Sequence, residues 1–180
     1  MRRRVGPALA TLAVTLLTAC ASVPTPDPEV PTSLSGRLSV RVDATADSAV
    51  RNLSAAFELR GDDRQGQLDL STPLGSVLAQ ARWAPGRVVL ATPQGERSFD
   101  DLDALTREAL GESVPVHALF DWLRGRPWPG APSVASQAPA EPGFRQLGWT
   151  VNLARFDEAW IAAQRDAAPA VQVRAKLDRP

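Results

Sequence analysis

Apolar and polar residues alternate along much of the chain from Leu38 onward, which is the pattern of half-buried β-strands. In the first such stretch, Leu38, Val40 and Val42 alternate with arginine and serine. The same alternation recurs between turn-forming segments at 53–59, 67–70, 77–83, 87–91, 147–153 and 171–177. Strands that follow one another at this spacing predict an antiparallel meander.

Two stretches in the middle of the chain change to the spacing of amphipathic helices. The first is Leu102–Leu110, which follows a capping-box pattern at Ser98–Asp101 and precedes Gly111, a residue suited to a helix end. A second short helix is predicted to begin at Pro115 and to close at Gly125, with one apolar side formed by Val116, Leu119, Phe120 and Leu123. Both apolar stripes need a sheet to lie against.

Two other segments lack a clear period. Residues 131–143 are rich in proline, alanine, serine and glutamine and predict a mobile connection. Residues 156–163 suit either a helical turn or a bent loop. The fold class is therefore mainly β with α, a strongly curved antiparallel sheet with two helices packed on its apolar face.

The inside of this sheet has two interpretations. A curved sheet with a short helical lid either fills its interior with side chains or leaves an apolar cavity. The pattern alone favours a filled core. The residues expected to face inward are Phe57, Leu59, Leu68, Leu70, Trp83, Leu90, Trp149 and Val151.

The amino-terminal segment has the layout of a secretory signal peptide, with Arg2–Arg4 followed by the apolar run Pro7–Leu17. It ends in Leu17-Thr18-Ala19-Cys20, which resembles the bacterial lipobox. This resemblance implies that Cys20 carries diacylglycerol, that residues 1–19 are removed, and that the new amino terminus is acylated. The alternative is an ordinary cysteine within a cleaved leader.

Residues 20–33 are predicted to form the lipidated cysteine and a tether, because Ala21–Ser33 contains four prolines and little to bury. Residues 34–180 then form a single domain. The chain has 20 basic and 20 acidic residues, and loss of the leader arginines leaves 17 against 20. With no basic run interleaved with aromatic residues, no nucleic-acid partner is expected.

Candidate catalytic groups are sparse. His117 is the only histidine, and Ser113 and Asp121 lie four residues to either side of it. Members of a catalytic triad normally converge from separate elements, so a hydrolase is not favoured. Helix capping, rather than a metal site, explains the carboxylates of Asp100, Asp101 and Asp103. We expect neither an enzyme nor a cofactor, apart from the covalent lipid on Cys20.

The loop Ser71–Ser76 has an unusual tip. Pro73 suits the second position of a turn and Gly75 the fourth, which places Leu74 at the tip. A leucine there either folds back onto the core or stands in solvent and forgoes about 1.5–3 kcal/mol of burial. The pattern alone favours folding back. A projecting leucine would instead be a small apolar wedge for a bilayer or an acyl chain.

An ordered set of segments resembles the LolB family of outer-membrane lipoproteins, and the match covers roughly 33–177 together with the lipobox. The matching segments are Leu34–Leu38, Leu70–Ser76, Pro85–Leu90 with Gly95–Glu96, Leu102–Leu110 and Val114–Gly125. No single segment is diagnostic without the others. The LolB resemblance implies an unclosed β-barrel whose short helices plug an apolar cavity, and it reverses the preference for a filled core.

The resemblance also implies roles for particular residues. Pro73, Leu74 and Gly75 would form a membrane-insertion loop in which Leu74 projects. The acyl-chain cavity would be lined by Phe57, Leu59, Leu68, Leu70, Trp83, Leu90, Leu119, Phe120, Leu123, Trp149 and Val151.

The implied partners are a soluble periplasmic carrier of the same fold (LolA), lipidated client proteins, and the inner leaflet of the outer membrane. The protein would be a lipid-anchored monomer that faces the periplasm, accepts lipoproteins from the carrier and inserts them. Ala21 fits outer-membrane sorting, since the residue that marks inner-membrane retention is an aspartate. The alternative is a non-catalytic outer-membrane scaffold or cell-wall-binding lipoprotein with a filled core.

Two features depart from the family pattern. The chain ends at Lys176–Pro180, without the longer closing strands and aromatic ending often found in the family. The loop Gly125–Gly130 adds Trp128, for which packing on the lid is the simplest expectation.

Overall fold

The structure is a computed structural model that describes residues 33–178. The predicted leader, Cys20 and all of the tether except Ser33 lie outside the described residues.

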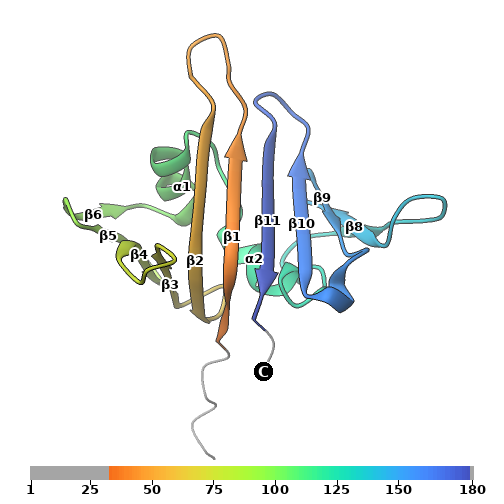
Figure 1. Cartoon of the computed structure of the whole chain (residues 1–180), viewed down its shortest axis with the longest axis horizontal. Coiled ribbons are helices and arrows are strands. Elements are labelled where there is room, and N and C mark those ends of the chain that lie inside the picture. Colours follow the sequence, from red (N-terminus) through yellow and green to blue (C-terminus); the bar gives the residue numbers. More distant parts are fainter. Residues whose placement is uncertain (1–32, 179–180) are drawn as a thin grey trace, which may run out of the picture. The chain divides into compact units, whose positions relative to one another are not determined.

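The described strands form one sheet in which every neighbouring pair is antiparallel (Figure 1). The strand order is β6-β5-β4-β3-β2-β1-β11-β10-β9-β8-β7. The strands are β1 (Leu34–Val42), β2 (Arg51–Gly61), β3 (Gly66–Ser71), β4 (Val77–Ala84), β5 (Arg87–Thr92), β6 (Gly95–Phe99), β7 (Ser133–Ala135), β8 (Gly143–Gln146), β9 (Trp149–Asn152), β10 (Trp160–Arg165) and β11 (Val171–Leu177).

The sheet consists of two meanders that meet in its middle. The first runs outward from β1 to β6, and the second runs inward from β7 to β11, which pairs with β1 from Gly36↔Leu177 to Val42↔Val171. The last strand of the chain is therefore central. Strands β6 and β7 are the two edges and do not pair with each other, so the predicted unclosed sheet is confirmed.

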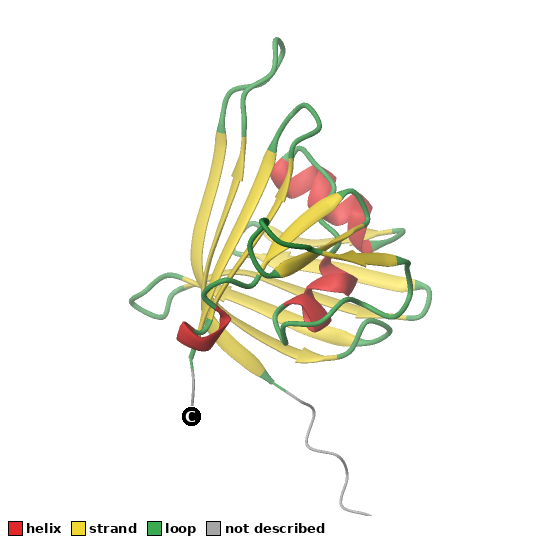
Figure 2. Ribbon diagram, turned by 90° about the vertical axis from the view of Figure 1, so that its right-hand side faces the viewer, coloured by secondary structure: helices red, strands yellow, loops and turns green. Residues whose placement is uncertain are grey.

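Two helices, α1 (Leu102–Leu110) and α2 (Val116–Trp122), connect one edge of the sheet to the other. Figure 2 shows them lying within the hollow of the curved strands. A 3-10 turn, η1 (Phe156–Glu158), precedes β10. This arrangement confirms the predicted fold class.

The core follows the alternation of the sequence. In β2, Ala55, Phe57 and Leu59 are buried, and their neighbours along the strand are more exposed. The backbones of β1 and β11 are very close at Gly36. A Cβ added there would lie 2.1 Å from the carbonyl oxygen of Lys176. Only glycine fits there without moving a strand.

The ends of α1 are satisfied locally. The carboxylate of Asp101 accepts a hydrogen bond from the Ala104 N–H at 2.6 Å, and Gly111 ends the helix in the left-handed conformation. The capping box expected at Ser98 is wrong, since Ser98 pairs with Val89 inside β6. Strand β6 continues to Phe99, and Asp101 is the N-cap of α1.

Two further expectations need correction. The segment 131–143 contains β7, which pairs with β8 from Ser133↔Gln146 to Ala135↔Phe144. The segment 156–163 contains η1 and then the first part of β10 rather than a single turn. Backbone pairing with a neighbouring strand defines both strands, and neither has a long alternating pattern of its own.

Candidate functional site

The loop between β3 and β4 is a tight turn with a projecting leucine. The Gly75 N–H donates to the Thr72 carbonyl at 2.9 Å, and the Ser76 N–H donates to the Thr72 hydroxyl at 3.1 Å. Gly75 has a φ of 86°, a conformation that glycine adopts at little cost. Leu74 is 95% exposed, and nearby Val77 is 62% exposed. Leu74 projects, as the family resemblance implies, and the folding back that the pattern alone favours is wrong.

Seven of the eleven residues expected to line a cavity belong to one hydrophobic cluster, and the other four, Leu68, Leu70, Leu90 and Leu119, are partly buried and pack against it. They come from the strands β2, β3, β4, β5 and β9 and from α2 and its carboxyl end. A small cavity of about 30 Å³ lies inside this cluster. Five of the eleven line it, namely Phe57, Leu59, Leu68, Leu119 and Leu123.

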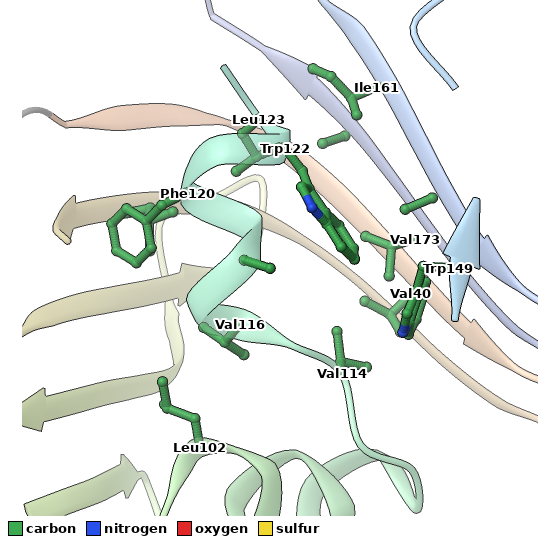
Figure 3. Packing of buried hydrophobic residues seen from close by; sticks show 14 of the residues in the cluster. Val40, Leu102, Val114, Val116, Phe120, Trp122, Leu123, Trp149, Ile161 and Val173 are labelled. Carbon is green, nitrogen blue, oxygen red and sulfur yellow. The ribbon is translucent and has the colours of Figure 1, made fainter. Parts of the chain in front are cut away.

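The other members pack around α2. Trp83 of β4 lies edge to face with Phe120, with ring centroids 5.6 Å apart. On the opposite side of the helix, Trp122 lies 6.0 Å from the ring of Trp149. Figure 3 shows Phe120 and Trp122 pointing away from each other, so α2 is wedged between the two halves of the sheet. Val151 is fully buried beside them, and Leu70 and Leu90 are partly buried against the cluster.

A second hollow, an open cleft of about 410 Å³, lies beside α2. Trp83, Val88 and Leu102 supply apolar surface to it, and His117 and Trp128 lie along it. Its rim carries charged side chains, which are Asp63, Arg64, Arg87, Asp100, Asp101 and Asp103.

Gln146 is a functional-site residue that sequence analysis missed, and it is buried on β8. Its side-chain oxygen accepts hydrogen bonds from the Trp122 ring N–H at 2.8 Å and from the Trp128 backbone N–H at 2.9 Å. Its amide nitrogen donates to the carbonyls of Trp128 and Ala131 at 2.7 and 2.8 Å. Four hydrogen bonds offset the cost of burying this amide. The available signal was one polar residue at an inward position, two residues after Phe144.

Trp128 packs on the lid as expected and also reaches across to the other half of the sheet. Its ring lies edge to face with His117 of α2, with centroids 4.5 Å apart. Its ring N–H donates to the carboxylate of Asp63, in the turn between β2 and β3, at 2.9 Å.

The ionised groups around α2 have structural partners. Asp121 is buried and pairs with Arg126 at 2.6 Å, so it does not orient His117. Burial lowers the pKa of Arg124, which donates to the Phe120 carbonyl and lies over the Phe120 ring. Glu112, between α1 and α2, pairs with Arg165 of β10 at 2.7 Å. Within residues 33–178, no group of histidine, cysteine and carboxylate side chains is arranged to hold a metal ion.

The sequence of this domain matches a known family over most of its length. The family model described as "Outer membrane lipoprotein LolB" matches residues 32–177. The chain belongs to the LolB family. Among its relatives, an outer-membrane lipoprotein LolB of Bordetella petrii is 39% identical over 79% of this chain and 75% of its own length.

Two further LolB relatives match over more of the chain. LolB of Bordetella pertussis is 33% identical over 94% of this chain and 90% of its own length. LolB of Ralstonia nicotianae is 35% identical over 99% of this chain and 88% of its own length. Membership of the LolB family makes the chain an outer-membrane lipoprotein of the lipoprotein-localisation pathway, facing the periplasm. The helices in the part that the structure describes are too short or too polar to cross a membrane.

Proposed function

We propose that this protein accepts lipoproteins from a periplasmic carrier by binding their acyl chains in its apolar interior, and then inserts them into the inner leaflet of the outer membrane. The observation that carries the proposal is a continuous apolar interior covered by one two-turn helix, α2, at the opening of an unclosed sheet. Acyl chains can replace the apolar side chains of α2 in contact with the sheet, and little apolar burial is lost in the exchange.

The binding step requires α2 to move. Pockets for ligands of moderate size measure about 300–1,000 Å³, whereas the cavity under α2 measures about 30 Å³. Displacement of Val116, Leu119 and Leu123 would open the space between β1, β2, β3 and β11 that these side chains now fill. Transfer between two apolar environments makes or breaks no covalent bond, so we propose neither a catalytic residue nor a cofactor.

The delivery step is assigned to the loop Pro73, Leu74 and Gly75. A fully exposed leucine forgoes about 1.5–3 kcal/mol of burial, which it regains in the acyl region of a bilayer. The turn from Thr72 to Gly75 holds the side chain outward without any rearrangement. We therefore propose that Leu74 disturbs the membrane surface where the cargo leaves.

The remaining parts of the proposal concern the anchor and the partners. Lipids on Cys20 would hold the protein at its destination, and the tether would let a monomer meet a LolA-like carrier in the periplasm. Each buried methylene of an anchor contributes about 0.8 kcal/mol, so three chains suffice for lasting attachment.

The alternative function is a non-catalytic outer-membrane scaffold or cell-wall-binding lipoprotein. The small volume of the cavity is the observation that favours it, because a filled core needs no opening.

Binding of a fluorescent fatty acid, 11-(dansylamino)undecanoic acid, separates the two functions. The protein would be residues 20–180 with Cys20→Ala, so that no lipid is attached. We expect saturable binding that Leu119→Trp weakens about tenfold, because the larger ring occupies the cavity. The matched control is Val134→Trp, an enlargement at least as great at a residue that is 68% exposed on β7. Absence of saturable binding to the folded protein would favour the scaffold.

A further inference from the structure

A tryptophan bridge closes the opening of the sheet beside α2. The segment from α2 to β7, residues 123–132, is called the strap here. The backbone of Trp128 in the strap is fixed to β8, because its N–H and its carbonyl both bond to Gln146. Its ring N–H donates a hydrogen bond to Asp63, in the turn between β2 and β3. One residue therefore joins the two meanders, whose edge strands do not pair with each other.

The Asp63 side of the bridge is held rigidly. The carboxylate of the preceding residue, Asp62, accepts hydrogen bonds from the backbone N–H groups of Arg64 and Gln65, both at 2.8 Å. These backbone hydrogen bonds lower the pKa of Asp62. The ring N–H of Trp83 donates to the Asp62 carbonyl at 3.1 Å. The turn is thereby tied both to itself and to β4, so Asp63 is a fixed acceptor.

The other side of the ring touches the lid. The ring of Trp128 packs against His117 of α2, and both residues lie along the cleft of about 410 Å³. Leu119 of the same helix and Leu123 at its carboxyl end line the small cavity. If the ring leaves Asp63, α2 loses its side support at His117, and the cleft lies next to the space that α2 vacates.

We propose that Trp128 is a latch for acyl-chain uptake, held shut by the hydrogen bond from its ring N–H to the carboxylate of Asp63. It is a positioning residue, since it acts through α2 and not by contact with a reacting group. The latch opens at this bond and not at Gln146, because Gln146 is only 3% exposed and makes four hydrogen bonds. Breaking that buried network would leave several polar groups without partners. This inference rests on the proposed function and names what regulates its binding step.

Stopped-flow uptake of 11-(dansylamino)undecanoic acid tests the latch, again with residues 20–180 carrying Cys20→Ala. Trp128→Phe keeps a smaller aromatic ring at this position but removes the donor, and Asp63→Ala removes the acceptor while it leaves the indole ring in place. Each substitution should accelerate uptake about three- to tenfold, as expected for loss of a hydrogen bond to a charged group in a partly exposed position. Because both remove the same bond, the double variant should be no faster than either single variant.

The matched control is Trp160→Phe. Trp160 lies between Arg155 and Lys176 at the start of β10, so its substitution makes the same chemical change away from the lid. Circular dichroism of every variant checks that it is folded, and Asp63→Ala serves if Trp128→Phe fails to fold. Wild-type uptake rates in both folded latch variants would overturn the latch and leave the proposed function standing. If neither the wild type nor the variants take up the fatty acid, both the latch and the proposed function are overturned.

Discussion

The exposure of Leu74 could not be predicted from its neighbours in the sequence. Its turn is satisfied by backbone and Thr72 hydrogen bonds alone, so nothing in the local chemistry requires a leucine at the tip. Because the hydrophobic effect favours burial, the local pattern favours a leucine folded onto the core. The structure instead exposes 95% of Leu74. Only the resemblance to the LolB family predicted that the side chain projects.

Substitution of Leu74 by glutamate should separate uptake from delivery. We expect Leu74→Glu to take cargo from a loaded carrier at the wild-type rate, since Leu74 lies outside the hydrophobic cluster. Delivery to liposomes should fall about tenfold, because a carboxylate is costly to place among acyl chains. Flotation of the liposomes measures the delivered cargo, with Leu74→Met as the apolar control. An equal loss of both steps would contradict this division of labour.

The hydrogen-bond partners of Gln146 could not be identified from the sequence. It lies at an inward position of β8, where the alternation calls for an apolar residue, and it is fully bonded by partners 15 to 24 positions earlier in the chain. A polar residue at a core position signals that a partner exists, but it does not identify the partner. The same is true of Trp128, whose bond to Asp63 spans 65 positions.

At the scale of elements, the sequence predicted best where side-chain period alone determines the structure. Strands β1 to β5, β11 and helix α1 follow alternation or helical spacing over many residues, and all were expected at or near their observed positions. By contrast, β7 has three exposed residues and exists because it pairs with β8. Strand β10 begins two residues after η1, and its short alternation of Ile161 and Ala163 does not distinguish a strand from a helical turn or a bent loop.

The start of α1 gives a test at this scale. Replacing the N-cap Asp101 by alanine should lower the free energy of unfolding by about 1 kcal/mol, because the Ala104 N–H loses its acceptor and the helix dipole loses a favourable charge. Urea denaturation followed by circular dichroism measures the change. Asp100→Ala, at the exposed neighbouring aspartate, is the control. Equal stability of Asp101→Ala and wild type would show that the cap contributes nothing.

At the scale of the whole described domain, the central fact is the topology of the sheet. Two meanders meet at β1 and β11, and their outer edges remain apart, with α1, α2 and the strap between them. A closed barrel would hold its interior by backbone hydrogen bonds on all sides. Here one side is held by side chains, which include Trp122, Trp128 and Glu112. The space between β6 and β7 is therefore closed by side-chain contacts and not by a strand ladder.

Transfer of cargo from a loaded carrier tests the central claim most directly. Residues 20–180 with Cys20→Ala would be mixed with a periplasmic carrier that holds a lipidated protein, and a pull-down would show which of the two then holds the cargo. Acyl-chain binding in the apolar interior predicts that the cargo moves to this protein, down a gradient of affinity. Cargo that stays on the carrier, while circular dichroism shows this protein folded, would contradict acyl-chain binding and leave the scaffold function in its place.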